Sequence, residues 1–117
     1  MSYRYGIFIY NQVAALDFVG PSDTFAISNQ LAEGGSVVTI ASDTSPITCL
    51  SGMRVTPDFS FANAPEVDVL LIPGTEGVDA LLEMDDALEW VKSRANQVKY
   101  LTSVCTGALL LQKAGLL

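Results

Sequence analysis

The chain has 117 residues, half of them hydrophobic, and its 13 acidic side chains outnumber six basic ones to give a formal net charge of −7. This length predicts a single domain over residues 1–117, and the acidity without any Lys/Arg cluster argues against nucleic acid as a partner. The sequence contains no histidine, which excludes Ser-His-Asp and Cys-His catalysis within the chain and most zinc sites, so we expect no metal and no cofactor.

The N-terminus and the cysteine content bear on localisation. The apolar run that opens at Tyr3 is interrupted by Asn11 and Asp17 and lacks a basic head, so it does not match a signal peptide. No apolar stretch approaches the length that crosses a bilayer. Two cysteines, Cys49 and Cys105, are too few for a disulfide framework and favour a reducing compartment. We therefore expect a cytoplasmic protein with no membrane partner.

Runs of β-branched and aromatic residues predict four main buried strands, and segments with helical spacing lie between them. We expect the four strands at 3–10, 37–41, 67–72 and 100–104. Between the first two lies a helix over 22–33, with Pro21 in its first turn and Gly34-Gly35 at its close, and after the second come a hairpin at 47–56 around Ser51-Gly52 and a connecting turn at 59–65. Helical segments follow the third strand at 78–82 and 88–91, with a break at 84–86, and a helix at 106–114 follows the fourth. This alternation implies βαβ units and a mostly parallel sheet between helical layers.

In such sheets, ligands bind beyond the carboxyl ends of the strands, and Asp17, Gly74 and Cys105 all fall at that edge. Asp17 taken alone is typical of a helix-capping aspartate, whereas beside Cys105 it is a carboxylate that can carry a proton to or from a substrate. Pro73-Gly74 taken alone ends a strand. Alternatively, the N–H groups of Gly74 and Thr106 form a cradle for negative charge on an electrophile that the thiol attacks.

Cys105 stands where strand formers give way to Ala/Leu helix formers, with the small residues Ser103 and Gly107 two positions to either side. This spacing is typical of a nucleophile elbow, with sulfur in place of the serine oxygen. The start of the following helix would favour the thiolate. The alternative is an inert buried cysteine, which is our interpretation of Cys49. Thr106 either offers its hydroxyl to the site or bonds its own backbone.

Three segments of the chain together resemble the ThiJ/PfpI superfamily, and most of all its isocyanide hydratase-like branch. They are Leu16-Asp17-Phe18-Val19-Gly20-Pro21, the 67–74 strand that ends in Ile-Pro-Gly, and 102–108 with 114–117, which read TSVCTGA and AGLL. The resemblance implies a flavodoxin-like α/β three-layer sandwich related to class I glutamine amidotransferases. It also implies that Cys105 is the nucleophile, Asp17 its acid–base partner and Thr106 an auxiliary hydrogen-bonding residue. The residues it implies for binding the substrate or its oxyanion are Gly74, Thr75 and Gly20.

The branch turns isocyanides into N-formamides by adding water, so the resemblance implies a lyase that acts on a small molecule. The thiolate attacks the terminal carbon and a thioimidate is then hydrolysed. Protease- and deglycase-like relatives often carry a histidine beside the cysteine, where this chain has Thr106, and this disfavours their activities. The family often has Gly-Gly where this chain has Gly74-Thr75.

Relatives carry further strands and helices after the elbow helix, whereas this chain ends at Leu117. We therefore expect the sheet to be incomplete at the C-terminus and exposed apolar surface to form a homodimer. Two alternatives to an enzyme remain open. The same fold occurs as the ligand-sensing half of AraC-type transcription regulators, so this chain is alternatively a non-catalytic sensor or a truncated, inactive relative. A third interpretation is redox sensing through oxidation of Cys105.

Overall fold

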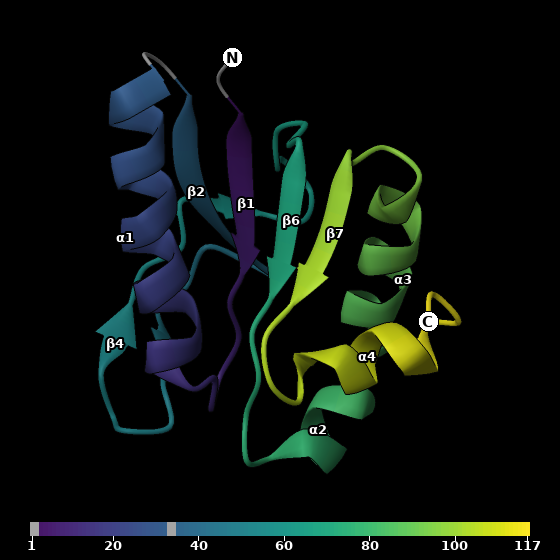
Figure 1. Ribbon diagram of the computed structural model, residues 1–117. Helices are drawn as coiled ribbons and strands as arrows, with labels where there is room; N and C mark the ends of the chain where they lie inside the picture. The colour runs from purple at the N-terminus through teal and green to yellow at the C-terminus, as the bar shows by residue number, and fades with distance from the viewer. Residues whose placement is uncertain (1–2, 33–34) are drawn as a thin grey trace.

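The computed structural model describes residues 3–32 and 35–117, in which strands and helices alternate (Figure 1). In chain order the elements are β1 Arg4–Phe8, α1 Ala15–Ala32, β2 Ser36–Ala41, β3 Ile47–Thr48, β4 Arg54–Val55, β5 Phe59–Ser60, β6 Val69–Ile72, α2 Val78–Leu82, α3 Asp85–Ala95, β7 Tyr100–Ser103 and α4 Gly107–Lys113. This order confirms the α/β class that the hydrophobic pattern predicts.

The main sheet has five parallel strands in the order β5-β2-β1-β6-β7. The central strand β1 pairs with both neighbours, so that Tyr5 lies opposite Val37 of β2 and Val69 of β6. Because the strands are parallel, their carboxyl ends meet at one edge, where the loops to α1, α2 and α4 leave the sheet (Figure 1). That edge is where α/β sheets of this kind bind ligands.

Helices cover both faces of the sheet, because alternate residues of a strand point to opposite sides. On one face, Tyr5 of β1 stacks on Phe25 of α1, with ring centroids 4.1 Å apart. On the other face, Phe8 packs 6.2 Å from Trp90 of α3. Figure 1 shows the same division, with α1 on one side of the sheet and α3 and α4 on the other. The result is the expected three-layer sandwich, with β6 buried at all four positions.

The helix after β1 begins six residues earlier than the sequence predicts. It starts at Ala15 and contains Pro21, whose ring removes one intrahelical N–H donor. Phe18 explains the early start, since its side chain is only 4% exposed and a helical first turn places it against the core. The predicted close of this helix at Gly34 lies outside the described residues.

One of two smaller expectations is confirmed and the other is not. The predicted hairpin is present, with β3 and β4 antiparallel around Gly52, and it forms a separate two-stranded sheet. The segment expected as a connecting turn contains β5, because Phe59 pairs with Ile40 and extends the main sheet. A strand of two residues is too short to give the alternation that sequence patterns detect.

No helix within residues 3–32 and 35–117 is both long and apolar enough to cross a bilayer.

Candidate functional site

The candidate site is formed by three segments that follow β1, β6 and β7 at the carboxyl edge of the sheet. Gly107 brings two of them together. A Cβ atom at this position would overlap the carbonyl oxygen of Ile72, so only glycine lets the start of α4 lie against the end of β6. The Val104 N–H donates to that same carbonyl at 3.0 Å. The turn after β7 is therefore fixed against β6 by a hydrogen bond and by close backbone packing.

Cys105 occupies the turn between β7 and α4 with an unusual backbone conformation. Its φ angle is 50°, a left-handed value that costs a non-glycine residue about 1–2 kcal/mol. The Gly107 N–H closes the turn by donating to Val104 at 3.0 Å. The Cys105 residue is exposed and its thiol forms no disulfide. Backbone strain of this kind concentrates at functional sites, where it aims a side chain.

Asp17 lies in the first turn of α1 and is half-buried. Its Oδ1 is 3.8 Å from the Cys105 Sγ, within reach of a sulfur hydrogen bond, and its Oδ2 accepts the Gly74 N–H at 3.2 Å. The carboxylate therefore reaches across the edge of the sheet to groups that follow β6 and β7. A thiol and a carboxylate at this separation can exchange a proton, which is the first requirement of a cysteine nucleophile with an acid–base partner.

Thr106 and Thr75 hold the two loops together through a reciprocal pair of hydrogen bonds. The Thr75 N–H donates to the Thr106 Oγ1 at 3.0 Å, and that hydroxyl donates to the Thr75 carbonyl at 2.9 Å. Thr75 is only 5% exposed, and its own hydroxyl donates to the Gln12 carbonyl at 2.6 Å and accepts the Gly77 N–H at 2.9 Å. The Thr106 hydroxyl thus positions the loop that carries the cysteine.

Gly74 is required where the three loops meet. A Cβ there would lie 2.7 Å from the Thr106 Oγ1 and 3.1 Å from the Asp17 Oδ2. The Gly74 N–H, which with the Thr106 N–H is one of the two amides considered for a cradle, donates to Asp17, and the Thr75 N–H donates to Thr106. Gly20 lies in α1 with open space beside its Cα, and its carbonyl accepts the Thr24 hydroxyl within the same helix.

Tyr10 supports the loop after β6 from the end of β1, and the sequence did not single it out. Its hydroxyl is buried and donates to the Pro73 carbonyl at 2.7 Å, which fixes the residue before Gly74. Burial, and to a lesser extent the charge of Asp17, raise the pKa of Tyr10. The signal that could have found it is its position just beyond the end of β1, where a tyrosine places a hydroxyl at the ligand-binding edge.

Several known proteins are similar to this chain over most or all of its length. The model of the DJ-1/PfpI family matches residues 4–117. The isonitrile hydratase of Pseudomonas putida is 37% identical over 117 residues, which are 100% of this chain and 50% of that protein. The HTH-type transcriptional regulator GbdR of Pseudomonas aeruginosa (strain PAO1) is 32% identical over 79 residues, or 68% of this chain and 21% of the regulator.

A solved structure extends the likeness to the backbone. The ThiJ/PfpI family protein from Pseudomonas syringae superposes with a TM-score of 0.90 at 29% identity, covering 100% of this chain and 48% of that one. The chain therefore spans about half the length of the isonitrile hydratase and of this structural neighbour.

Proposed function

This chain belongs to the DJ-1/PfpI family, and we propose that it carries the nucleophile and the acid–base group of a cysteine-dependent hydratase. The proposed reaction adds water to a small electrophile, namely an isocyanide, to give an N-formamide. Cys105 supplies the nucleophile and Asp17 carries the protons. Thr106, Thr75 and Gly74 hold these two side chains in place.

One observation carries this proposal, namely the 3.8 Å separation between the Cys105 Sγ and the Asp17 Oδ1. The two side chains come from segments 88 positions apart in the chain. Both are held: Asp17 by the Gly74 N–H and Cys105 by its left-handed turn. An exposed thiol beside a half-buried carboxylate is the pair that nucleophilic addition followed by hydrolysis requires.

The proton balance of the reaction needs one mobile proton at Asp17. The thiol passes its proton to Asp17 as sulfur attacks the terminal carbon of R–N≡C. Asp17 returns that proton to the same carbon, which gives the thioimidate R–N=CH–S–Cys105. A water molecule then adds its oxygen to this carbon, with one proton reaching nitrogen and the other passing through Asp17 to sulfur. The C–S bond breaks, and R–NH–CHO leaves with the thiol regenerated.

The surroundings of Asp17 suit this cycle. The Gly74 N–H holds Oδ2 and leaves Oδ1 directed at sulfur, so one oxygen is an anchor and the other handles protons. An isocyanide carries no net charge, so the acidic character of a chain with net charge −7 presents no barrier to its approach.

The test is turnover of benzyl isocyanide to N-benzylformamide, followed by chromatography. We expect Cys105→Ala to reduce the rate to the uncatalysed background, while the matched control Cys49→Ala retains turnover because its side chain is buried away from the site. Turnover that survives in Cys105→Ala, or no N-formamide from the unsubstituted chain, would contradict the proposal.

A second candidate function is ligand sensing without catalysis, which the similarity to an HTH-type transcriptional regulator over 79 residues favours. In that case the thiol would bind or recognise a small molecule without turnover. Incubation with benzyl isocyanide separates the two functions. A stable mass increase on Cys105 without released N-formamide supports the sensor, and multiple turnovers support the enzyme.

We also propose a cytoplasmic homodimer. The support is the exposure of two large apolar side chains of α1, since Leu16 is 82% exposed and Ile27 is 59% exposed. Exposed apolar side chains of this size can contribute to a protein contact. Light scattering of the purified chain should give twice the monomer mass, and Leu16→Glu with Ile27→Glu should return it to the monomer. A monomeric unsubstituted chain would contradict this proposal.

A further inference from the structure

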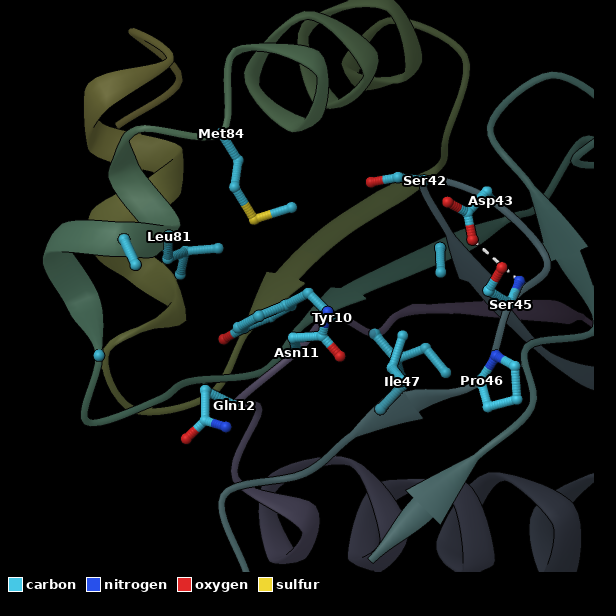
Figure 2. A pocket seen from close by; sticks show the side chains of 14 residues that line it. Tyr10, Asn11, Gln12, Ser42, Asp43, Ser45, Pro46, Ile47, Leu81 and Met84 are labelled. Carbon is cyan, nitrogen blue, oxygen red and sulfur yellow. Dashed lines mark hydrogen bonds between the residues drawn. The ribbon is translucent and has the colours of Figure 1, made fainter. Parts of the chain in front are cut away.

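A cavity of about 380 Å³ lies at the carboxyl edge of the sheet, beyond β1 and β2 and beside α2. Figure 2 shows the side chains that line it. Volumes in this range hold small organic molecules. Asp17, Cys105 and Thr106 do not belong to its lining, so the cavity is separate from the cysteine site.

The inner wall of the cavity is apolar. The Tyr10 ring, Leu81 and Ile47 are 3%, 1% and 6% exposed, and Met84 reaches toward the ring from above in Figure 2. The Tyr10 ring is fixed because its hydroxyl is bonded to Pro73. These nearly buried side chains form the floor of the cavity, and the flexible thioether of the half-buried Met84 adapts to an aromatic or aliphatic body above it.

The residues that follow Tyr10 in the lining are polar, and hydrogen bonds hold them in place. The Asn11 Oδ1 accepts the Thr48 N–H at 2.9 Å, and the Gln12 N–H donates to the Thr48 carbonyl at 2.7 Å. Gln12 has a left-handed φ of 73°, which these bonds and the Thr75 hydroxyl maintain. The end of β1 is thereby tied to β3, so the cavity is formed before any ligand arrives.

Asp43 determines which ligand charge the cavity favours. It is the one charged residue among the described residues of the lining, which contains neither lysine nor arginine. The Asp43 Oδ1 accepts the Ser45 N–H at 2.8 Å, which fixes the carboxylate at the rim (Figure 2). An ionised carboxylate has acceptor capacity for further donors. A fixed negative charge next to an apolar wall favours a small cation with an apolar body and disfavours anions.

We propose that this cavity is a second ligand site, independent of the chemistry at Cys105, and that it binds a small arylalkylamine-type cation. The apolar body lies against Met84 and Ala80, over a floor that the Tyr10 ring and Leu81 form, and the ammonium group donates to Asp43. This role goes beyond the proposed hydration and does not require it.

The experiment titrates the ¹⁵N-labelled chain with 2-phenylethylamine, and separately with the neutral 2-phenylethanol and the anionic 3-phenylpropionate. We expect saturable shifts of the amide signals of Ser45, Ile47 and Leu81, with a Kd for the amine on the order of 1 mM or below. Phenylethanol should bind more weakly, and phenylpropionate more weakly still. Linear, non-saturating shifts with the amine, or equal affinity for the anion, would overturn the proposal.

Two substitutions test whether the Asp43 carboxylate binds the ammonium group. Asp43→Asn keeps an acceptor for the Ser45 N–H and removes only the charge, so we expect it to weaken amine binding about two- to fivefold and leave phenylethanol unchanged. Asp23→Asn is the matched control, since Asp23 is an exposed carboxylate of α1 outside the cavity. Equal effects of the two substitutions would overturn the role of Asp43.

Two further variants test the location. Ala80→Trp adds an indole to an exposed lining position of α2 and should abolish binding of both the amine and the alcohol. Cys105→Ala should bind the amine as the unsubstituted chain does, which separates this proposal from the fate of the hydration reaction. Binding that survives Ala80→Trp, or that is lost in Cys105→Ala, would overturn an independent site in this cavity.

Discussion

The two cysteines of this chain show how the backbone decides what a thiol can do. Cys49 directly follows β3 and is 0% exposed. Its N–H donates to the Met53 carbonyl, and its own carbonyl accepts the Gly52 N–H. Burial raises the pKa of the Cys49 thiol. Cys105 has a left-handed φ, is exposed and faces Asp17.

The difference comes from the turn and not from the residue type. A cysteine beside a strand that packs on the core is sealed by its neighbours, whereas the strand-to-helix turn lifts Cys105 out of the sheet toward the groups that follow other strands. Ile72 and Gly107 fix that turn through backbone contact. Two kinds of experiment therefore test the contrast. One measures the reactivity of each thiol, and the other alters the groups that position Cys105.

The largest expected effect is in alkylation. Iodoacetamide should modify Cys105 in the folded chain, whereas Cys49 should react only when the fold opens, which a stability of 5 kcal/mol or more suppresses by roughly 10³-fold or more. Peptide mass spectrometry at timed intervals measures both rates. In denaturant the two rates should converge, which serves as the control. Equal alkylation rates of Cys105 and Cys49 in the folded chain would contradict the contrast between an exposed and a buried thiol.

The next effect concerns the partner that Cys105 has and Cys49 lacks. Asp17→Asn retains an acceptor for the Gly74 N–H but cannot carry a proton, so we expect benzyl isocyanide turnover to fall by at least about 10²-fold with the fold intact. Asp23→Asn, on the same helix and exposed, should leave turnover unchanged. Comparable rates in Asp17→Asn and the unsubstituted chain would remove Asp17 from the mechanism.

The meeting of Asp17 and Cys105 could be predicted from the sequence because it follows from topology. Parallel strands bring their carboxyl ends to one edge, so residues after β1, β6 and β7 must be neighbours once the strands are recognised. Four strong apolar runs made that recognition straightforward. Ser103 and Gly107 marked the tight turn for the same local reason, since small residues are needed where two backbones cross.

The remaining details depend on tertiary packing, which no local pattern encodes. The helix begins at Ala15 because Phe18 is drawn into the core, although Pro21 favours a later start. The bond from the Gly74 N–H to Asp17 forms only because the loops after β1 and β6 meet. Tyr10 lies at the end of a predicted strand, and its bond to the Pro73 carbonyl requires β1 and β6 to lie side by side.

A substitution at Gly107 should displace the turn that distinguishes Cys105 from Cys49. Gly107→Ala places a methyl group against the Ile72 carbonyl, and we expect it to lower the free energy of unfolding by about 1–3 kcal/mol and to reduce turnover. Gly20→Ala is the matched control, since nothing lies within 4 Å of its added Cβ within α1, and it should raise stability by about 0.5–1 kcal/mol. Urea unfolding measures both, and a neutral Gly107→Ala would show that the turn is not fixed by this contact.

The smallest effect is the pH dependence that burial of Cys49 imposes. Because burial raises the Cys49 pKa above its ordinary 9.0, the unfolded chain loses that proton first, so the stabilising contribution is complete below pH 9 and declines as pH rises above it. A single group changes stability by at most about 1.4 kcal/mol per pH unit. Cys49→Ala should therefore flatten the slope of unfolding free energy between pH 9 and pH 10, below the range where Tyr10 contributes in the same direction. Comparing slopes rather than absolute stabilities removes the packing lost with the sulfur, and identical slopes would mean that Cys49 ionises as freely in the fold as outside it.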